Sequence, residues 1–186
     1  RKSMKMPVFP NWYPYNEMLL DGRLQIGDYA VKTRSWDWKY RGPVLLYTSG
    51  RVARQAVSAY EYECNPLKHI IVGIAELVET RPLSHGEAKK MVENFNNLPP
   101  IAVTNLFGKM LDLIKNDSEI PDFPFLVNEM GYIAPFRNGF FFRNLKRFKT
   151  PVPFNWPSGP IKPIFIQTAR YPQLHAQILT ASHSQS

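Results

Sequence analysis

The sequence predicts an α+β domain around a curved sheet or a small β-barrel. Several short segments have the pattern of strands but lie too far apart to be joined as hairpins, and the helical segments fall between them. The 186 residues are enough for one domain, and 44% of them are hydrophobic, which is sufficient for a buried core. We therefore expect a single domain over residues 1–186.

The first third of the chain predicts one helix and two strands. Residues 1–15 are rich in proline and aromatic residues, which favours an extended arm. Residues 16–24 predict a short helix capped by Asn16. Residues 29–34 alternate like a strand, and residues 43–49 contain VLLY, which is typical of a strand buried on both faces.

The next two elements are a helix and the strongest strand of the chain. Residues 51–62 place Val52, Ala56 and Tyr60 near helical spacing, which predicts a helix. Residues 69–80, HIIVGIAELVET, have the composition of a buried strand.

Residues 84–130 differ from their surroundings and predict a helical insertion. Ser84 and Glu87 have the spacing of a capping box at the start of a helix. Leu106, Met110 and Leu113 lie on one side of a second amphipathic helix.

The last third predicts strands over residues 132–142 and 163–168, separated by a rigid proline loop over residues 151–163. The small, polar tail over residues 180–186 is expected to fray.

The positive charge is concentrated near the C-terminal end. The net charge is +8, and residues 131–186 hold seven basic residues, no acidic ones and ten of the 25 aromatic residues. Cations mixed with aromatic rings suit a surface that binds phosphates and stacks on bases. Arg143, Lys146, Arg147 and Lys149 crowd together without an acid nearby. The alternative is a solvated basic face over an ordinary aromatic core.

Two stretches resemble the ASCH domain of the PUA-like superfamily. They are KTRSWDWKYRGPVLLYTSGR at residues 32–51, with its arginine-tryptophan strand and tyrosine-arginine-glycine turn, and IIVGIAELVE at residues 70–79. The resemblance implies a small PUA-like β-barrel with flanking helices and a cleft beside the arginine-tryptophan strand. It also implies nucleic-acid binding, mainly of RNA, although some members hydrolyse an acetylated cytidine or RNA.

The chain departs from the family pattern at two positions. The usual lysine is Tyr29, and the usual glutamate or threonine is Lys32. Neither a phenol nor an ammonium is a ready general base at neutral pH, so family-type hydrolysis is not expected from this pair.

Residues two apart on a strand share a face, so Lys32, Arg34, Trp36 and Trp38 are expected to line one side of the cleft, with Arg41 in the turn beside it. Alternatively, Trp36 fills the barrel and Arg34 pairs with an internal carboxylate such as Glu76.

The segment Thr48-Ser49-Gly50-Arg51 follows a buried strand and precedes a predicted helix. Backbone amides at a helix start and the Arg51 charge could hold a phosphate there. Capping of the helix by Ser49 or Thr48 is the alternative.

The sequence thus favours an RNA-binding or single-stranded nucleic-acid-binding module. Its expected contact residues are Tyr29, Lys32, Arg34, Trp36, Arg41, Thr48, Ser49, Arg51, Arg143, Lys146, Arg147 and Lys149. One alternative is a hydrolase of modified nucleosides or RNA that uses Lys32 or Tyr29. The other is a protein-interaction module that binds a partner through residues 84–130.

Other classes of site and location are not expected. The four histidines have no metal-ligand spacing and Cys64 is the single cysteine, so neither a metal nor a cofactor is expected. The sequence also lacks an apolar run long enough to span a membrane, and the residues at its start lack the apolar stretch of a signal peptide. We therefore expect a cytoplasmic protein with no membrane partner.

Overall fold

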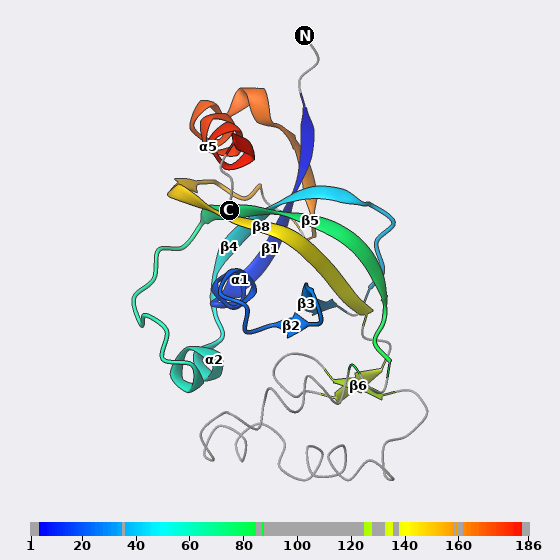
Figure 1. The fold of residues 1–186 in the computed structure, drawn as a ribbon. Coiled ribbons are helices and arrows are strands. Elements are labelled where there is room, and N and C mark those ends of the chain that lie inside the picture. The colour runs from blue at the N-terminus through cyan, green and yellow to red at the C-terminus, as the bar shows by residue number, and fades with distance from the viewer. Residues whose placement is uncertain are drawn as a thin grey trace.

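A computed structural model of the chain describes residues 4–34, 36–84, 87, 125–127, 133–135, 138–157, 159 and 162–183. Its main element is a seven-stranded sheet in the order β2-β3-β8-β5-β4-β1-β9 (Figure 1). The strands are β1 (Lys5–Tyr13), β2 (Gln25–Ile26), β3 (Tyr29–Arg34), β4 (Gly42–Val52), β5 (Ile70–Pro82), β8 (Asn138–Pro153) and β9 (Ile164–Gln167). Strand β1 is parallel to β4, and the other neighbours are antiparallel.

The remaining elements are helical, apart from one small hairpin. The helices are α1 (Tyr15–Leu20), α2 (Arg54–Ala59), the 3-10 helix η1 (Thr168–Arg170) and α5 (Pro172–His183). Strands β6 (Phe125–Val127) and β7 (Ile133–Pro135) pair with each other in a separate two-stranded sheet. The α+β class predicted from the sequence is therefore confirmed. None of the helices described is long and apolar enough to cross a bilayer.

The large sheet is curved but is not the closed PUA-like barrel that the resemblance implied. Strands β5 and β8 arch over α1 and β3 (Figure 1), and their pairing is interrupted by three register shifts, which bend a sheet. The outermost strands β2 and β9 have only two and four residues, and no pairing between them is found in the described residues. Such short edges offer few hydrogen-bonding groups with which to close the sheet.

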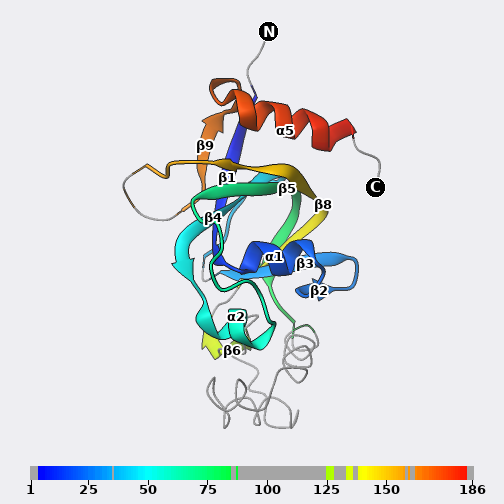
Figure 2. The same ribbon diagram turned by 90° about the vertical axis from the view of Figure 1, so that its left-hand side faces the viewer.

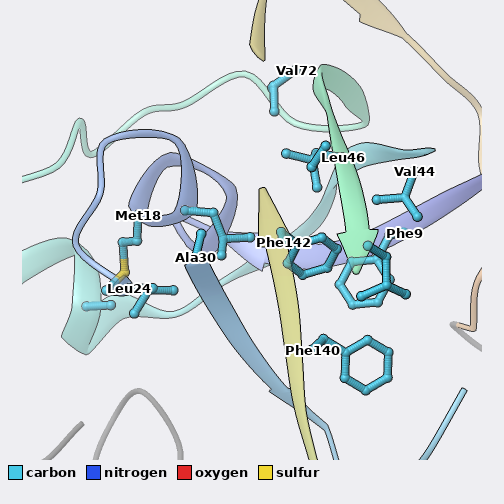
Figure 3. Packing of buried hydrophobic residues seen from close by; sticks show 13 residues of the cluster. Phe9, Met18, Leu24, Ala30, Val44, Leu46, Val72, Phe140 and Phe142 are labelled. Carbon is cyan, nitrogen blue, oxygen red and sulfur yellow. The ribbon is translucent and has the colours of Figure 1, made fainter. Parts of the chain in front are cut away.

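Alternating side chains divide the core into an inner and an outer face. The inner face, on the side of α1, contains Phe9, Leu46, Phe140 and Phe142, with Met18 of α1 packed against them (Figure 3). The outer face contains Val8, next to Phe9 on β1, and Leu45 and Tyr47, on either side of Leu46 on β4. It is covered by α5 through Leu174, Ile178 and Ala181. Figure 2 shows α5 and α1 on opposite sides of β5 and β8. Adjacent residues of one strand therefore face different environments.

The strands expected over residues 29–34, 43–49, 69–80 and 163–168 are confirmed as β3, β4, β5 and β9. The capping box is also confirmed: Glu87 N donates to Ser84 Oγ (3.2 Å) and Ser84 N donates to Glu87 Oε1 (2.9 Å). Most of the segment 84–130 lies outside the described residues, and the part described near its end is the strand β6 rather than a helix.

Three expectations for the first 62 residues were wrong. The proline-rich start is not an arm but the strand β1, which lies between β4 and β9. Pro14 is the N-cap of α1, while Asn16 lies within the helix and its amide faces the core. The helix expected over residues 51–62 is limited to α2, because β4 continues to Val52.

Two expectations near the C-terminal end were also wrong. The proline loop begins later than expected, because β8 extends to Pro153. The tail is helical as far as His183, because Ala181 is buried and its carbonyl accepts a hydrogen bond from Lys146 Nζ (2.9 Å).

Candidate nucleic-acid interface

A chain of buried polar side chains crosses the inner face. Arg34 Nη2 donates to Asn11 Oδ1, Asn11 Nδ2 donates to Asn16 Oδ1 (2.6 Å), and Asn16 Nδ2 donates to Thr48 Oγ1 (3.1 Å). Asn11, Asn16 and Thr48 are at most 2% exposed. The chain joins β3, β1, α1 and β4, so it connects two predicted site residues, Arg34 and Thr48.

Arg34 is held as a tie between β3 and β1. Its guanidinium also donates to the carbonyl oxygens of Pro10 (2.8 Å) and Thr33 (2.9 Å), and lies 4.8 Å from the centroid of the Phe9 ring. The expected pairing with Glu76 is wrong, because Glu76 lies on β5 and accepts a hydrogen bond from Arg143 instead.

Lys32 and Tyr29 do not come together. Lys32 is buried, and its Nζ lies 4.2 Å from the centroid of the Tyr15 ring. Tyr29 packs edge-on against Phe141 in the separate cluster that contains Val31 (centroids 6.2 Å apart). Residues three apart on a strand point to opposite faces, so a nucleotide in one cleft would not contact both side chains, and they do not form a catalytic pair.

Three half-buried rings, Trp36, Trp38 and Tyr40, and the exposed ring of Phe165 form what we call the aromatic strip. Trp38 stacks on Tyr40 (centroids 5.0 Å apart, planes at 29°), and Phe165 meets Tyr40 edge-on (5.5 Å). Trp36 meets Trp38 edge-on (6.4 Å). Half of the Phe165 surface is exposed.

The strip rests on the inner core. Trp36 packs on Phe140 (5.0 Å), and Trp38 lies parallel to Phe9 (6.4 Å, 20°). Trp36 is therefore partly a core residue, as one of the two readings of the sequence expected, while its remaining surface stays accessible.

Hydrogen bonds fix the loop that carries the strip. Arg41 Nη1 donates to the carbonyl oxygens of Trp38 and Tyr40 (both 2.7 Å), and Arg41 Nη2 donates to Thr80 Oγ1 (3.0 Å). The Thr80 hydroxyl donates to the Asp37 carboxylate (2.6 Å), and this bond is the main reason that the pKa of Asp37 is lowered. Arg41 thus positions the loop, and it remains exposed.

Ser49 and Arg51 lie on the outer face of β4, whereas Thr48 lies on the inner face. Both belong to the strand rather than to a helix start, because α2 begins at Arg54 with Ala53 as its N-cap and no side-chain cap. Neither the phosphate site at a helix start nor helix capping by Ser49 or Thr48 is therefore found.

The basic residues of β8 are partly neutralised by acids from elsewhere in the chain. Arg143 Nε lies 2.9 Å from Glu76 Oε1, and Arg147 Nη1 lies 2.8 Å from Glu17 Oε1. The hydrogen bond from Arg143 is the main cause of a lowered pKa of Glu76. The expectation of uncompensated charge is thus wrong for these two residues.

The basic side chains of β8 also lie on different sides of the strand. Arg147 contacts α1 on the inner side, and Lys146 contacts α5 on the outer side. Lys149 is exposed, and within the described residues it makes no ion pair or hydrogen bond.

No metal centre is found in the ranges that the structure describes, where no three His, Cys, Asp or Glu side chains lie close enough to share an ion. Cys64 is exposed. The proposed partner surface over residues 84–130 lies almost wholly outside the described residues.

Sequence reasoning missed several residues of this region. Asn11 lies between apolar positions of β1, so an isolated polar residue in apolar surroundings was the available signal there, whereas Asn16 stands beside the charged Glu17 and gave no such signal. Phe165 and Lys39 had no such signal, because their position beside the tryptophans depends on how β9 and the 36–41 loop pack.

Comparison with known proteins finds similarity in fold. No family model matches the chain, and no curated protein matches it in sequence. Two solved structures of the ASCH protein from Zymomonas mobilis, one of them a mutant, are similar to it. The mutant structure is 9% identical, with 93% of this chain and 98% of that chain covered and a TM-score of 0.46. The other is 9% identical, with 94% of each chain covered and a TM-score of 0.47. The ASCH resemblance noted in the sequence is found again in this comparison.

Proposed function

We propose that the chain binds single-stranded nucleic acid, RNA in the first place, on the aromatic strip. The observation that carries this proposal is a row of three half-buried rings on a loop fixed by hydrogen bonds, continued by the exposed Phe165 ring of β9. Every base has a flat π face, so unpaired bases can stack on such rings without regard to sequence.

Cations beside the strip supply contacts for phosphates. Lys39 lies between Trp38 and Tyr40 in the loop and is exposed, as is Arg41. Arg34 shares the Phe9 ring with Trp38, so its charge lies behind the same rings. Stacking rings and cations on one surface are the combination that single-stranded nucleic acids require. The sequence resemblance to the ASCH family supports the same class of ligand.

The predicted residues contribute unequally to this proposal. Trp36 contacts the ligand, and Arg41 holds the loop. Arg34 and Thr48 belong to the buried polar chain behind the strip, and Lys32 lies buried on the same face as Arg34. Lys149 lies near the far end of β8 from Phe140, on which the strip packs, so no contact with the bound bases is assigned to it. Arg143, Lys146 and Arg147 contribute weakly, because each already has a partner within the fold.

Binding of a fluorescent single-stranded RNA, followed by anisotropy at several salt concentrations, tests the proposal. Phe165→Ala removes a half-exposed ring, and loss of one base stack, about 1–3 kcal/mol, weakens binding about 5- to 150-fold. Lys39→Glu is expected to weaken binding and to lower the dependence on salt, because fewer counterions are released.

Leu179→Ala is the matched control, since Leu179 is also a large exposed apolar residue, 47% exposed, but lies on α5. It should leave the affinity unchanged. If Phe165→Ala and Lys39→Glu both bind RNA like the unaltered protein, the strip is not the interface.

A further inference from the structure

A second candidate site lies on the outer face, at the end of β4. It is a pocket of about 370 Å³ lined by Tyr47, Ser49, Arg51, His69, Asn155 and Trp156. Ligand pockets generally range from ~300 to 1,000 Å³, so this one has room for a single small ligand. It opens away from the inner face that carries the aromatic strip, because Tyr47 and Ser49 flank the inward-facing Thr48 on β4.

The floor of the pocket is flat and aromatic. Tyr47 is 2% exposed and stacks on the half-buried Trp156 (centroids 5.1 Å apart, planes at 27°). Phe154 supports both rings edge-on, at 5.7 Å from Tyr47 and 6.3 Å from Trp156. Such a floor suits a planar ring.

The imidazole of His69 is fixed at one wall. Its Nδ1 lies 3.1 Å from the Tyr47 hydroxyl, and no hydrogen bond of Nε2 is found among the described residues. Gly50 makes room for the ring, since a Cβ at this position would lie 2.8 Å from His69 Cε1 and 2.9 Å from Nε2. A side chain at residue 50 would therefore push the imidazole out of its place.

The polar groups of the pocket favour an anion. The Arg51 guanidinium lies over the exposed Trp12 ring at 5.4 Å from its centroid, and no carboxylate of the described residues pairs with it. Ser49 is 6% exposed, and its hydroxyl accepts only the Arg51 backbone N–H among the described hydrogen bonds (3.4 Å). None of the described residues that line the pocket is acidic.

Asn155 adds an exposed amide that can both donate and accept at the edge of a ring. A flat aromatic floor, an amide and a guanidinium together match a ligand that has a planar heterocycle and a phosphate.

We infer that this pocket binds a nucleoside monophosphate, with the base on Trp156 and the phosphate on Arg51. The ligand is either a free nucleotide or the phosphorylated end of a strand, which have the same chemistry. The inference does not depend on the aromatic strip.

Isothermal titration calorimetry of the full chain with AMP, GMP, CMP and UMP tests this site. At least one of them should bind, while adenosine and ribose 5-phosphate, which each lack half of the ligand, should bind at least about tenfold more weakly than AMP. Absence of binding for all four nucleotides at about 1 mM overturns the inference. Equal affinity for ribose 5-phosphate and AMP overturns the role of the base.

Variants locate the site. Arg51→Gln removes the charge and should weaken binding about 10- to 100-fold, as expected for a lost hydrogen bond to a charged group. Gly50→Ala should weaken binding by displacing His69. Arg54→Gln is the matched control, because Arg54 is exposed three residues away, and it should bind like the unaltered protein.

If Gly50→Ala does not fold, Arg51→Gln and Asn155→Ala carry the test, since both alter exposed side chains. Unchanged nucleotide affinity in Arg51→Gln overturns the assignment.

Short RNAs with a 5′-phosphate or a 5′-hydroxyl distinguish a free nucleotide from the end of a strand. Their affinities are measured with and without Arg51→Gln in protein that carries Phe165→Ala, so that binding to the aromatic strip is reduced. If Arg51→Gln weakens only the phosphorylated RNA, the ligand is a strand end. If it weakens only the mononucleotides, the ligand is a free nucleotide. If the RNA assay shows that the aromatic strip does not bind RNA, the pocket can still be tested. The pocket variants and the strip variants share no residue apart from the Phe165→Ala background.

Discussion

Replacing Asn16 by alanine should destabilise the protein more than the loss of such a small side chain suggests. Asn16 is 1% exposed, accepts from Asn11 Nδ2 (2.6 Å) and donates to Thr48 Oγ1 (3.1 Å). Alanine leaves both partners buried without this hydrogen bond, and each unsatisfied group costs about 1–3 kcal/mol. Allowing for partial relaxation, we expect a loss of about 2–4 kcal/mol in the free energy of unfolding.

Equilibrium unfolding in urea measures this loss. With a slope of about 2 kcal/mol per molar urea, the midpoint should fall by about 1–2 M. Asn65→Ala is the matched control, because Asn65 is exposed and, among the described hydrogen bonds, takes part only through its backbone N–H, which donates to Glu63. Its midpoint should stay within the error of the measurement.

A double-mutant cycle with Thr48→Val isolates the bond between the two side chains. The two losses should fall short of additivity by at least about 0.5 kcal/mol, as is usual for residues in one network. A loss below about 0.5 kcal/mol for Asn16→Ala, or additive losses in the cycle, would show that the buried chain does not hold β1, α1 and β4 together.

Two further predictions concern stability. Pairing with Arg81 lowers the pKa of Glu87 from 4.5 to about 2, so the ionised carboxylate stabilises the fold above pH 4.5, and this contribution is lost as the pH falls towards 2. The unfolding free energy of Glu87→Gln should therefore depend less on pH over this interval, and an unchanged dependence would contradict the pairing. Gly73→Ala should reduce the free energy of unfolding by about 1–3 kcal/mol through overpacking and so lower the thermal midpoint, because a Cβ there would clash with the backbone oxygen of Lys146; an unaltered midpoint would disprove this close approach.

The strands that could be predicted are those whose local pattern reports burial directly. Residues 29–34, 43–49 and 69–80 alternate or are uniformly apolar, and they form β3, β4 and β5. Strand β1 escaped prediction because Pro7 and Pro10 lack the N–H that an inner strand normally donates, and prolines are usually found at sheet edges.

The site could be predicted only in part, because its contacts join distant segments. The resemblance to the ASCH family pointed to the arginine-tryptophan strand, and alternation correctly placed Lys32 and Arg34 on one face. The ion pair of Glu17 with Arg147 spans 130 residues, and no local pattern reports it. Charge density in the sequence therefore overstated the free charge on β8.

The position of β1 has a consequence for how the protein is made. Residues Lys5–Val8 pair with β9, at Ile164–Gln167, so β1 leaves the ribosome long before the strand that pairs with this edge (Figure 2). Until then one hydrogen-bonding edge of β1 stays open, and open edges of nascent strands are where chains join wrongly with one another. Slow vectorial synthesis should therefore expose this molecule to misassembly longer than a protein built from local hairpins.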